Sequence, residues 1–416
     1  MRYRSCYFLF SSMVFRPTKF FEDAYFNIFG QTKVKQVLQF SQRNLFDIPD
    51  DIAYFNCSYM SPQLNESRTL LMNGVNRKSN PWNWIASDFF SQAEEIRLLC
   101  ASLFGGKNDN YAVIPSASYG LSTAARAVEP TLKKNDQILI LAEDFPSNVL
   151  AWRRVCAEVD SEIITLSKEI GSDWTSTILK NIDSKTKVVA IPSCHWTNGE
   201  IIDLEKIGTK CKELGIIYVV DATQTLGAMP HSVETIQADF LVSSGYKWLL
   251  CPYGFSILFA SEKWYDARPL EETWLGRENV ENFAGLIMYN DNYQKGARRF
   301  EMGEKGIPTI LPGAIAALQQ IKKWGVENIS SSLGIINNQL SSFFTSNGFQ
   351  AIENKMRVPH ILGINLGADN KNYVSELKEK NIYISQRGKS LRIAPHLHIT
   401  RDDMEKLMSE ILKLKN

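Results

Sequence analysis

The chain has 416 residues, of which 44% are hydrophobic and 22% are charged. This composition is typical of a globular protein with enough apolar material for one large domain and one smaller domain. The 46 basic and 45 acidic residues leave a net charge of +1, which gives no electrostatic reason to expect nucleic acid or an anionic membrane as a partner.

The seven cysteines are scattered along the chain, are odd in number and show no C-x-x-C spacing. This pattern excludes a disulfide framework and a zinc site, and it favours a reducing, cytoplasmic compartment. The five histidines also lack metal-ligand spacing, so we expect no metal. Sequence motifs for dinucleotide binding, P-loops, zinc proteases and serine hydrolases are absent.

The first fifteen residues, MRYRSCYFLFSSMVF, combine basic residues with an apolar run that is too short to span a bilayer. We interpret residues 1–43 as an N-terminal extension. A weak targeting segment is an alternative because no acidic residue occurs before Glu22. A chain that begins at Met13 is another.

Short apolar runs alternate with amphipathic stretches from about residue 108. They predict strands at 111–114, 137–142, 162–166, 187–192, 216–220, 240–243 and 255–259, and helices at 121–128, 147–159, 175–181 and 204–214. This order predicts an α/β fold with a mainly parallel sheet flanked by helices.

The pattern changes after Pro312. Long helical stretches at 313–323 and 326–346 precede short strands at 349–352, 360–366, 382–385 and 391–394, and a helix at 401–414 follows Thr400 as N-cap. We therefore predict a smaller C-terminal α+β domain at 307–416 and a large domain at 71–306. Residues 44–70 are predicted to pack on the small domain.

Ligands of open α/β sheets bind at the carboxyl ends of the parallel strands. Asp221 ends one predicted strand, in VVDATQ, and Lys247 follows the next one, in DFLVSSGYKWL. A carboxylate at that position either caps the next helix or pairs with a cationic ring nitrogen. A partly desolvated lysine there can act as a nucleophile. The two residues lie 26 positions apart with one strand between them, which favours a joint chemical role.

Two other strand ends support this interpretation more weakly. The segment PSASYG begins a helix after the strand 111–114, and small residues at a helix N-terminus leave backbone N–H groups free for a phosphate. The segment EDFPSN follows the strand 137–142, and Phe145 within it can stack on a flat ring. A plain helix cap and a core phenylalanine explain the same residues.

Together, VVDATQTLG and DFLVSSGYKWL resemble the class V, fold-type I aminotransferases, a superfamily that also includes cysteine desulfurases, kynureninases and isopenicillin-N-epimerase-like proteins. The resemblance runs from about Ile52 to the C-terminus. It implies a homodimeric enzyme that carries pyridoxal 5'-phosphate as a Schiff base on Lys247, with an amino acid as substrate and a 2-oxo acid as possible second substrate.

The resemblance also implies roles for individual residues. Asp221 would face the pyridine nitrogen, Gln224 and His195 would lie near the ring oxygen, and Phe145 would stack on the ring. The phosphate would be held by Ala117, Ser118, Ser244 and Tyr246. A purely structural histidine remains an alternative for His195.

Arg392, in SLRIAPH, resembles the family's arginine that binds the substrate α-carboxylate, and its planar guanidinium suits that task. Two features depart from the family. The sequence has no cysteine between Ala351 and Leu391, which disfavours cysteine desulfurase chemistry because a persulfide needs a thiolate. Glu304 stands where much of the family has a threonine that reaches the partner subunit's phosphate, and its carboxylate should repel that group.

The sequence predicts chemistry at the α-carbon of an amino acid, with Lys247 as the proton carrier and Asp221 as the group that keeps the ring protonated. Transamination is preferred because it needs no further catalytic group. A kynureninase-like lyase and an amino-acid epimerase use the same residues and remain alternatives. A non-catalytic binding module with the same fold is a further alternative.

Overall fold

The computed structural model describes residues 41–169, 171–366 and 371–415. Most of the predicted N-terminal extension therefore lies outside the described residues. The predicted boundaries between the N-terminal segment, the large domain and the small domain stay a prediction.

The main element is a seven-stranded sheet in the order β2-β8-β7-β6-β5-β3-β4. The neighbouring strands β7, β6, β5, β3 and β4 all run parallel to one another. Strand β8 runs antiparallel to both of its neighbours, β7 and β2. The strands are β2 (Tyr111–Ile114), β3 (Gln137–Leu141), β4 (Glu162–Leu166), β5 (Thr186–Pro192), β6 (Ile217–Asp221), β7 (Phe240–Ser244) and β8 (Ser256–Ala260). The predicted mainly parallel sheet is confirmed.

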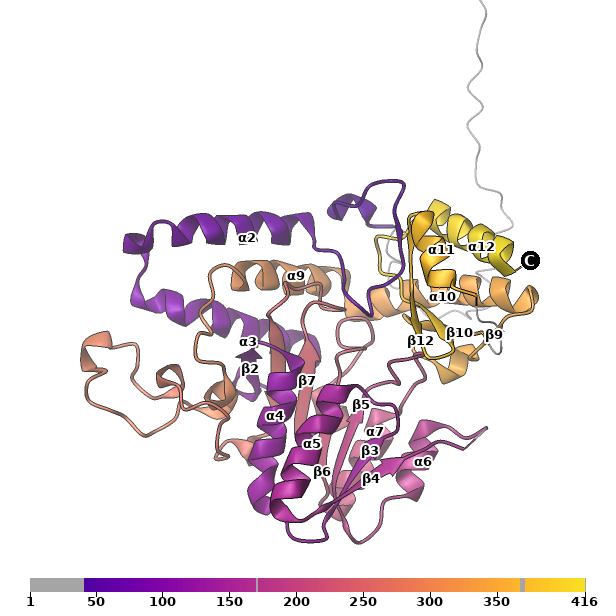
Figure 1. Ribbon diagram of the computed structural model, residues 1–416. Helices are drawn as coiled ribbons and strands as arrows, with labels where there is room; N and C mark the ends of the chain where they lie inside the picture. Colours follow the sequence, from indigo (N-terminus) through magenta and orange to yellow (C-terminus); the bar gives the residue numbers. More distant parts are fainter. Residues whose placement is uncertain (1–40, 170, 367–370, 416) are drawn as a thin grey trace, which may run out of the picture. The chain divides into compact units, whose positions relative to one another are not determined.

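Helices cover both faces of this sheet (Figure 1). Alternate residues of a strand enter two different cores, as Val188 and Val189 of β5 do. One core contains side chains of α4 and α5, and the other contains side chains of α6 and α7. These helices are α4 (Ala117–Val128), α5 (Pro146–Val159), α6 (Trp174–Lys180) and α7 (Leu204–Leu214). Burial on both faces explains why the strands are continuous apolar runs.

The C-terminal part has its own four-stranded sheet, in the order β12-β13-β10-β9. Its elements are α9 (Leu311–Trp324), α10 (Val326–Ser346), β9 (Gln350–Ala351), β10 (Leu362–Asn365), α11 (Tyr373–Glu379), β11 (Ile382–Tyr383), β12 (Ser385–Arg387), β13 (Ser390–Ile393) and α12 (Arg401–Lys415). Strand β1 (Ala53–Tyr54) pairs with β11 in parallel. Thr400 accepts a hydrogen bond from the N–H of Asp403 at 3.1 Å, as expected of the cap of α12.

Two long helices near the N-terminus extend the fold beyond the elements predicted from sequence. They are α2 (Asn65–Lys78) and α3 (Ser91–Phe104), and both pack against α9. Gly74 permits a very close approach of α2, because a Cβ at this position would lie 1.9 Å from the carbonyl oxygen of Pro308. A short helix α8 (Val233–Ile236) precedes β7.

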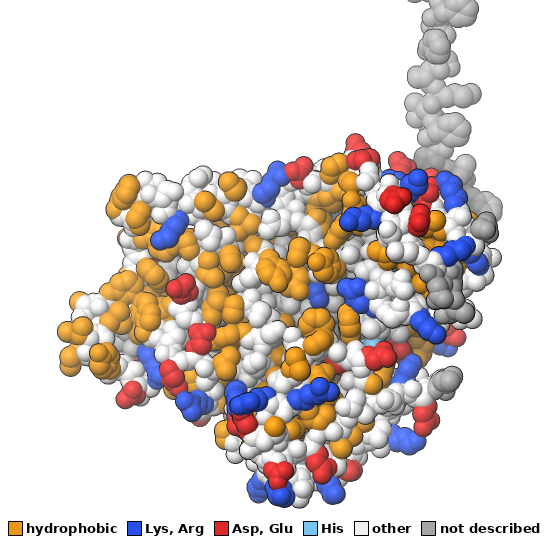
Figure 2. Space-filling model, viewed as in Figure 1, with side chains coloured by type: hydrophobic (Ala, Val, Ile, Leu, Met, Phe, Trp, Pro, Cys, Tyr) orange, Lys and Arg blue, Asp and Glu red, His pale blue; other side chains and the backbone are white. Residues whose placement is uncertain are grey.

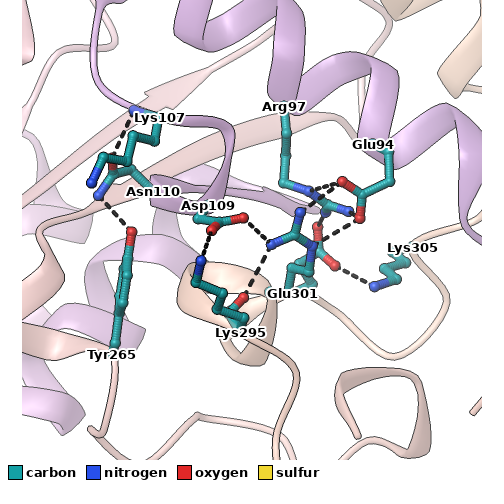
Figure 3. Close-up of polar contacts among 10 residues, drawn as sticks. Glu94, Arg97, Lys107, Asp109, Asn110, Tyr265, Lys295, Glu301 and Lys305 are labelled. Atoms are coloured by element: carbon teal, nitrogen blue, oxygen red, sulfur yellow. Dashed lines mark hydrogen bonds and ion pairs between the residues drawn. The ribbon is translucent and has the colours of Figure 1, made fainter. Parts of the chain in front are cut away.

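A buried ion network joins α3 to the segment that leads into α9 (Figure 3). The carboxylate of Glu301 pairs with Arg97 and, at 2.5 Å, with Lys305, and all three side chains are 1% exposed. Glu301 also accepts a hydrogen bond from the N–H of Val113 in β2 at 3.2 Å. Charges buried in this way require partners, so the network ties α3, β2 and the 298–305 segment together.

Neither a membrane-spanning helix nor a metal-binding cluster occurs within the described ranges. No helix there has both the length and the apolar content needed to cross a membrane. No cluster of histidine, cysteine or acidic side chains there could hold a metal ion.

Candidate active site

The carboxyl ends of five strands meet at one edge of the large sheet and line a pocket. The pocket is lined by residues that follow β2, β3, β5, β6 and β7, namely Ala117, Asp144, Phe145, Pro192, Trp196, Asp221, Thr223, Gln224, Ser244, Tyr246 and Lys247. The structure thus brings together seven of the ten predicted site residues; Ser118, His195 and Arg392 are not in the lining.

Lys247 projects into this pocket from the turn after β7, and only 7% of the residue is exposed. Its Nζ lies 5.6 Å from the ring centroid of Phe145 and 5.7 Å from that of Tyr246. Burial lowers the pKa of the amine to about 8, and the positive charge of Arg392 also lowers it, whereas Asp221 acts in the opposite direction. The uncharged, nucleophilic amine is therefore more abundant at neutral pH than for an exposed lysine.

Asp221 ends β6 on the same side of the pocket and is 7% exposed. Its Oδ1 accepts a hydrogen bond from the N–H of Thr223 at 3.0 Å. Burial raises the pKa of this carboxyl, while Thr223 and the charge of Lys247 lower it. A buried carboxylate with so few donors can accept a further N–H from a ligand.

Asp144 is a second buried carboxyl of the pocket, and the sequence analysis did not select it. It accepts hydrogen bonds from the side chain of Asn148 at 2.8 Å and from the N–H of Phe145 at 2.6 Å. Burial, reinforced by the negative charge of Asp221, raises the pKa of Asp144 to about 7. Its position directly after β3 was the available signal, but nothing in the sequence places it beside Asp221.

The N-terminus of α4 forms another wall of the pocket. Ser116 caps the helix by accepting a hydrogen bond from the N–H of Tyr119 at 3.1 Å, and Ala117 lines the pocket. The hydroxyl of Ser118 lies 2.8 Å from that of Ser147, at the start of α5. Exposed N–H groups and hydroxyls at a helix N-terminus suit an anionic ligand.

Phe145 and Trp196 form an aromatic wall, with ring centroids 5.7 Å apart in an edge-to-face arrangement. Trp196 donates its indole N–H to the carbonyl oxygen of Glu143 at 2.7 Å, which fixes it beside the segment that carries Phe145. Phe145 is 41% exposed, so its ring does not fill a core and has a face that can stack on a ligand. Trp196 is a second pocket residue that the sequence analysis missed.

Gln224 is held by the protein at both ends of its side chain. Its amide nitrogen donates to the carbonyl oxygen of Ser58 at 3.1 Å, and its amide oxygen accepts from the indole N–H of Trp248 at 3.1 Å. These bonds fix the orientation of the amide at the pocket wall. One amide N–H remains for a ligand.

His195 has protein partners on both ring nitrogens. Its Nδ1 lies 2.7 Å from the hydroxyl of Thr197 and its Nε2 lies 3.3 Å from the carbonyl oxygen of Ala142. The ring also stacks on Trp174, with centroids 5.2 Å apart and planes inclined by 3°. The geometry favours the structural alternative for this histidine over a contact with the ligand.

Arg392 lies next to the pocket on β13 and is 1% exposed. Its Nη1 donates to the carbonyl oxygen of Trp196 at 2.7 Å, and its Nε donates to the hydroxyl of Ser385 at 3.1 Å. Burial lowers the pKa of the guanidinium, and the charge of Arg387 adds to this effect. No carboxylate of the described residues pairs with Arg392, so the guanidinium is positioned but still lacks an anion.

These residues fit the cofactor that the sequence predicts. The pocket offers an amine with a lowered pKa, a buried carboxylate that lacks a cationic N–H partner, an exposed aromatic face and a helix N-terminus. Pyridoxal phosphate presents an aldehyde, a ring nitrogen, a flat ring and a phosphate, respectively, to those four features.

Comparison with known proteins gives an independent test. A family model described as "Aminotransferase class-V" matches residues 70–401. The Bacillus subtilis protein named uncharacterized aminotransferase YcbU is 26% identical over 331 residues, which cover 79% of this chain and 85% of that protein. A probable cysteine desulfurase of Pyrococcus abyssi is 29% identical over 239 residues, or 57% of each chain. The family match confirms the resemblance that the sequence motifs indicated.

Solved structures agree with this match at the level of the fold. The apo cysteine desulfurase of Thermococcus onnurineus NA1 has a TM-score of 0.76 and 19% identity over 89% of this chain and 96% of its own. The cystine C-S lyase C-DES, solved with its product cysteine persulfide, has a TM-score of 0.78 and 16% identity over 88% and 98%. The predicted fold class is thereby confirmed.

Proposed function

The chain belongs to the class-V aminotransferase family, and from this premise we propose that it transfers the amino group of an amino acid to a 2-oxo acid. The family establishes the coarser statement that the chain is a pyridoxal 5'-phosphate-dependent enzyme of the class V type acting on amino acids. The predictions of enzyme class and cofactor are confirmed. The assignment of roles to single residues, and the choice of transamination, are proposals.

The observation that carries the proposal is the placement of Lys247 and Asp221 in one pocket. Bound pyridoxal phosphate supplies an electron sink for the α-carbon of an amino acid. Lys247 is proposed to hold the cofactor through its amine and, once released from it, to move a proton to and from the α-carbon. A pKa of about 8 suits that task, because the amine can accept and return a proton near neutral pH.

Asp221 is proposed to accept the N–H of the pyridine ring and to keep that nitrogen protonated. The buried carboxylate is stabilised by the positive charge that it gains as a partner. The pKa of Asp144 is about 7, so at neutral pH its carboxyl is partly ionised and partly protonated. When it is ionised, it adds a second negative charge beside Asp221. We propose that Asp144 supports Asp221 in holding that proton.

The remaining pocket residues orient the cofactor and the substrate. Phe145 is proposed to stack on the ring, and the start of α4 with Ala117, Ser118, Ser244 and Tyr246 to bind the phosphate. Gln224 is proposed to donate to the ring oxygen. Arg392 is proposed to bind the α-carboxylate, since it is buried, fixed by two hydrogen bonds and without an ion-pair partner among the described residues.

Cysteine desulfurase chemistry is less well supported. Each of the six cysteines within the described residues is buried, and burial raises the pKa of the Cys194 thiol, which interacts with the charges of Lys247 and Asp221, to about 12. Such thiols are poor nucleophiles. A lyase or an epimerase that needs no thiol remains the second candidate, because it would use the same lysine and aspartate.

The reaction class can be tested with the holoenzyme and a panel of amino acids without an acceptor. We expect one 2-oxo acid to be released per active site, after which the reaction stops until a 2-oxo acid is added. A lyase would instead continue to release product and ammonia without an acceptor. An epimerase would produce the opposite enantiomer and no 2-oxo acid. Either of these results would contradict transamination.

We also propose a homodimer, which is supported by an exposed apolar surface. The 270–293 loop projects from the large domain, and hydrophobic side chains gather on it (Figures 1 and 2). Its Ile287, Met288 and Tyr289 are 80%, 76% and 94% exposed, and Trp82, in the segment between α2 and α3, is 75% exposed. Apolar groups exposed together in this way usually mark an interface.

An oligomeric-state measurement tests this proposal. Light scattering after gel filtration should give twice the 47.2 kDa of one chain. The double substitution Ile287→Asp and Tyr289→Asp should shift the protein towards the monomer, because it places charges in the proposed interface. A monomeric parent protein would contradict the homodimer. The cytoplasmic location expected from the scattered cysteines likewise stays a prediction.

A further inference from the structure

A second arginine lies beside the proposed α-carboxylate site. Arg387 on β12 and Arg392 on β13 belong to adjacent antiparallel strands. Their guanidinium carbons lie 5.5 Å and 5.8 Å from the ring centroid of Trp196. Trp196 itself lines the proposed active-site pocket. Both cations therefore lie against the same aromatic wall of the site.

The two arginines have no anionic partner of their own. Within the described part of the chain, no carboxylate lies within ion-pair distance of either guanidinium. Arg387 makes one hydrogen bond, from Nη1 to the carbonyl oxygen of Gln386 at 2.7 Å. A guanidinium has five N–H donors, so most of those of Arg387 remain available to a ligand.

Each of these positive charges makes the charged form of the neighbouring basic groups less favourable. The positive charge of Arg387 contributes to the lowered pKa of both Arg392 and Lys247. Asp221 and Asp144 are the acidic groups of the pocket, and Asp221 is already assigned to the pyridine ring. Three cations close together are stabilised when a ligand brings more than one negative group.

Arg387 also lines a cleft next to the pocket, with a volume of about 640 Å³. Two of its lining residues, Glu143 and Thr197, directly adjoin the pocket residues Asp144 and Trp196 in sequence. Its lining has two cations, Arg387 and Lys389, and one acid, the exposed Glu143. A substrate side chain that leaves the pocket in this direction meets a positively charged surface.

We propose that Arg387 binds an acidic side chain of the substrate, so that the enzyme acts on dicarboxylic amino acids such as glutamate or aspartate. This inference rests on the proposed function, because it assumes that Arg392 takes the α-carboxylate. Arg387 binds the second carboxylate through its free N–H groups, and both guanidinium groups lie near the ring of Trp196. The planar, permanently charged guanidinium is the side chain best suited to a carboxylate.

The test compares each acidic amino acid with its amide, which has nearly the same shape but no negative charge. The holoenzyme is mixed with glutamate or glutamine, and with aspartate or asparagine, and kcat/KM is measured from the absorbance of the bound cofactor and from 2-oxo acid release. We expect the parent protein to prefer one acid over its amide by about 10- to 100-fold, the range expected for a hydrogen-bonded charge. Arg387→Gln should abolish most of this preference, and Arg387→Lys should restore part of it.

Arg153→Gln is the matched control, because Arg153 is an exposed arginine of α5 outside the pocket and the cleft. It removes the same charge and should leave the ratio of acid to amide unchanged. The proposal is overturned if the parent protein prefers the amide or a neutral amino acid, or if Arg387→Gln slows the acid and its amide equally. Failure of the proposed function gives a different result: no amino acid alters the absorbance, although the cofactor is attached to Lys247. The proposed substrate class would then be wrong as well, because it depends on that function.

Discussion

Replacing Lys247 by alanine should abolish covalent attachment of the cofactor and lower kcat/KM by about 10⁴-fold, the upper end of the effect of a positioned acid–base group. The amine is the only lysine nitrogen in the pocket lining, so no described side chain there can replace it. The measurement is borohydride reduction of the holoprotein followed by mass spectrometry, together with the visible spectrum. Retention of a reducible adduct in Lys247→Ala would place the attachment at another lysine.

The pKa of Lys247 adds a pH dependence to this prediction. Because the folded-state pKa is lowered to about 8 from the usual 10.5, roughly a tenth of the amine is uncharged at pH 7. The initial rate at which the apoprotein attaches added pyridoxal phosphate should therefore rise with pH up to about 8 and level off above it. Lys247→Arg, which keeps the positive charge but not the nucleophile, should show no attachment at any pH. A rate that keeps rising to pH 10 would contradict the lowered pKa.

Much of the fold was predictable because its central strands are buried on both faces. Continuous apolar runs located β3, β5 and β6 to within a residue or two, and the polar residues that follow them located the edge of the sheet that carries the site. Lys247 and Asp221 were found because strand ends converge in any open parallel sheet. That inference requires only the order of the strands and helices along the chain.

Other features depend on contacts that no local pattern records. The antiparallel direction of β8 leaves its apolar run unchanged, so periodicity cannot reveal it. The helix α2 has an interior glycine and a mostly polar sequence, and its stability comes from packing against α9. A one-dimensional sequence also hides the proximity of Asp144 to Asp221, and that of Arg387 to Trp196, because each pair lies on separate elements.

The largest effect on stability is expected from Glu301→Gln. The neutral amide still accepts the hydrogen bond from the N–H of Val113, but it leaves Lys305 buried without its ion-pair partner, whereas Arg97 keeps its ion pair with Glu94. Removing one partner of a buried ion pair costs about 3–5 kcal/mol of the free energy of unfolding. Urea denaturation of the apoprotein, followed by tryptophan fluorescence, should show this loss as a lower transition midpoint.

The same region offers a control in the exposed ion pair between Glu262 and Lys107, the latter drawn in Figure 3. Glu262→Gln also removes one negative charge, but the side chains of Glu262 and Lys107 are 60% and 70% exposed. The transition midpoint should therefore hardly change. Equal shifts in both variants would mean that burial does not set the strength of the Glu301 pairs. Because Glu301 also anchors β2, whose end leads to Ala117, Glu301→Gln should further weaken binding of pyridoxal phosphate, whereas Glu262→Gln should not.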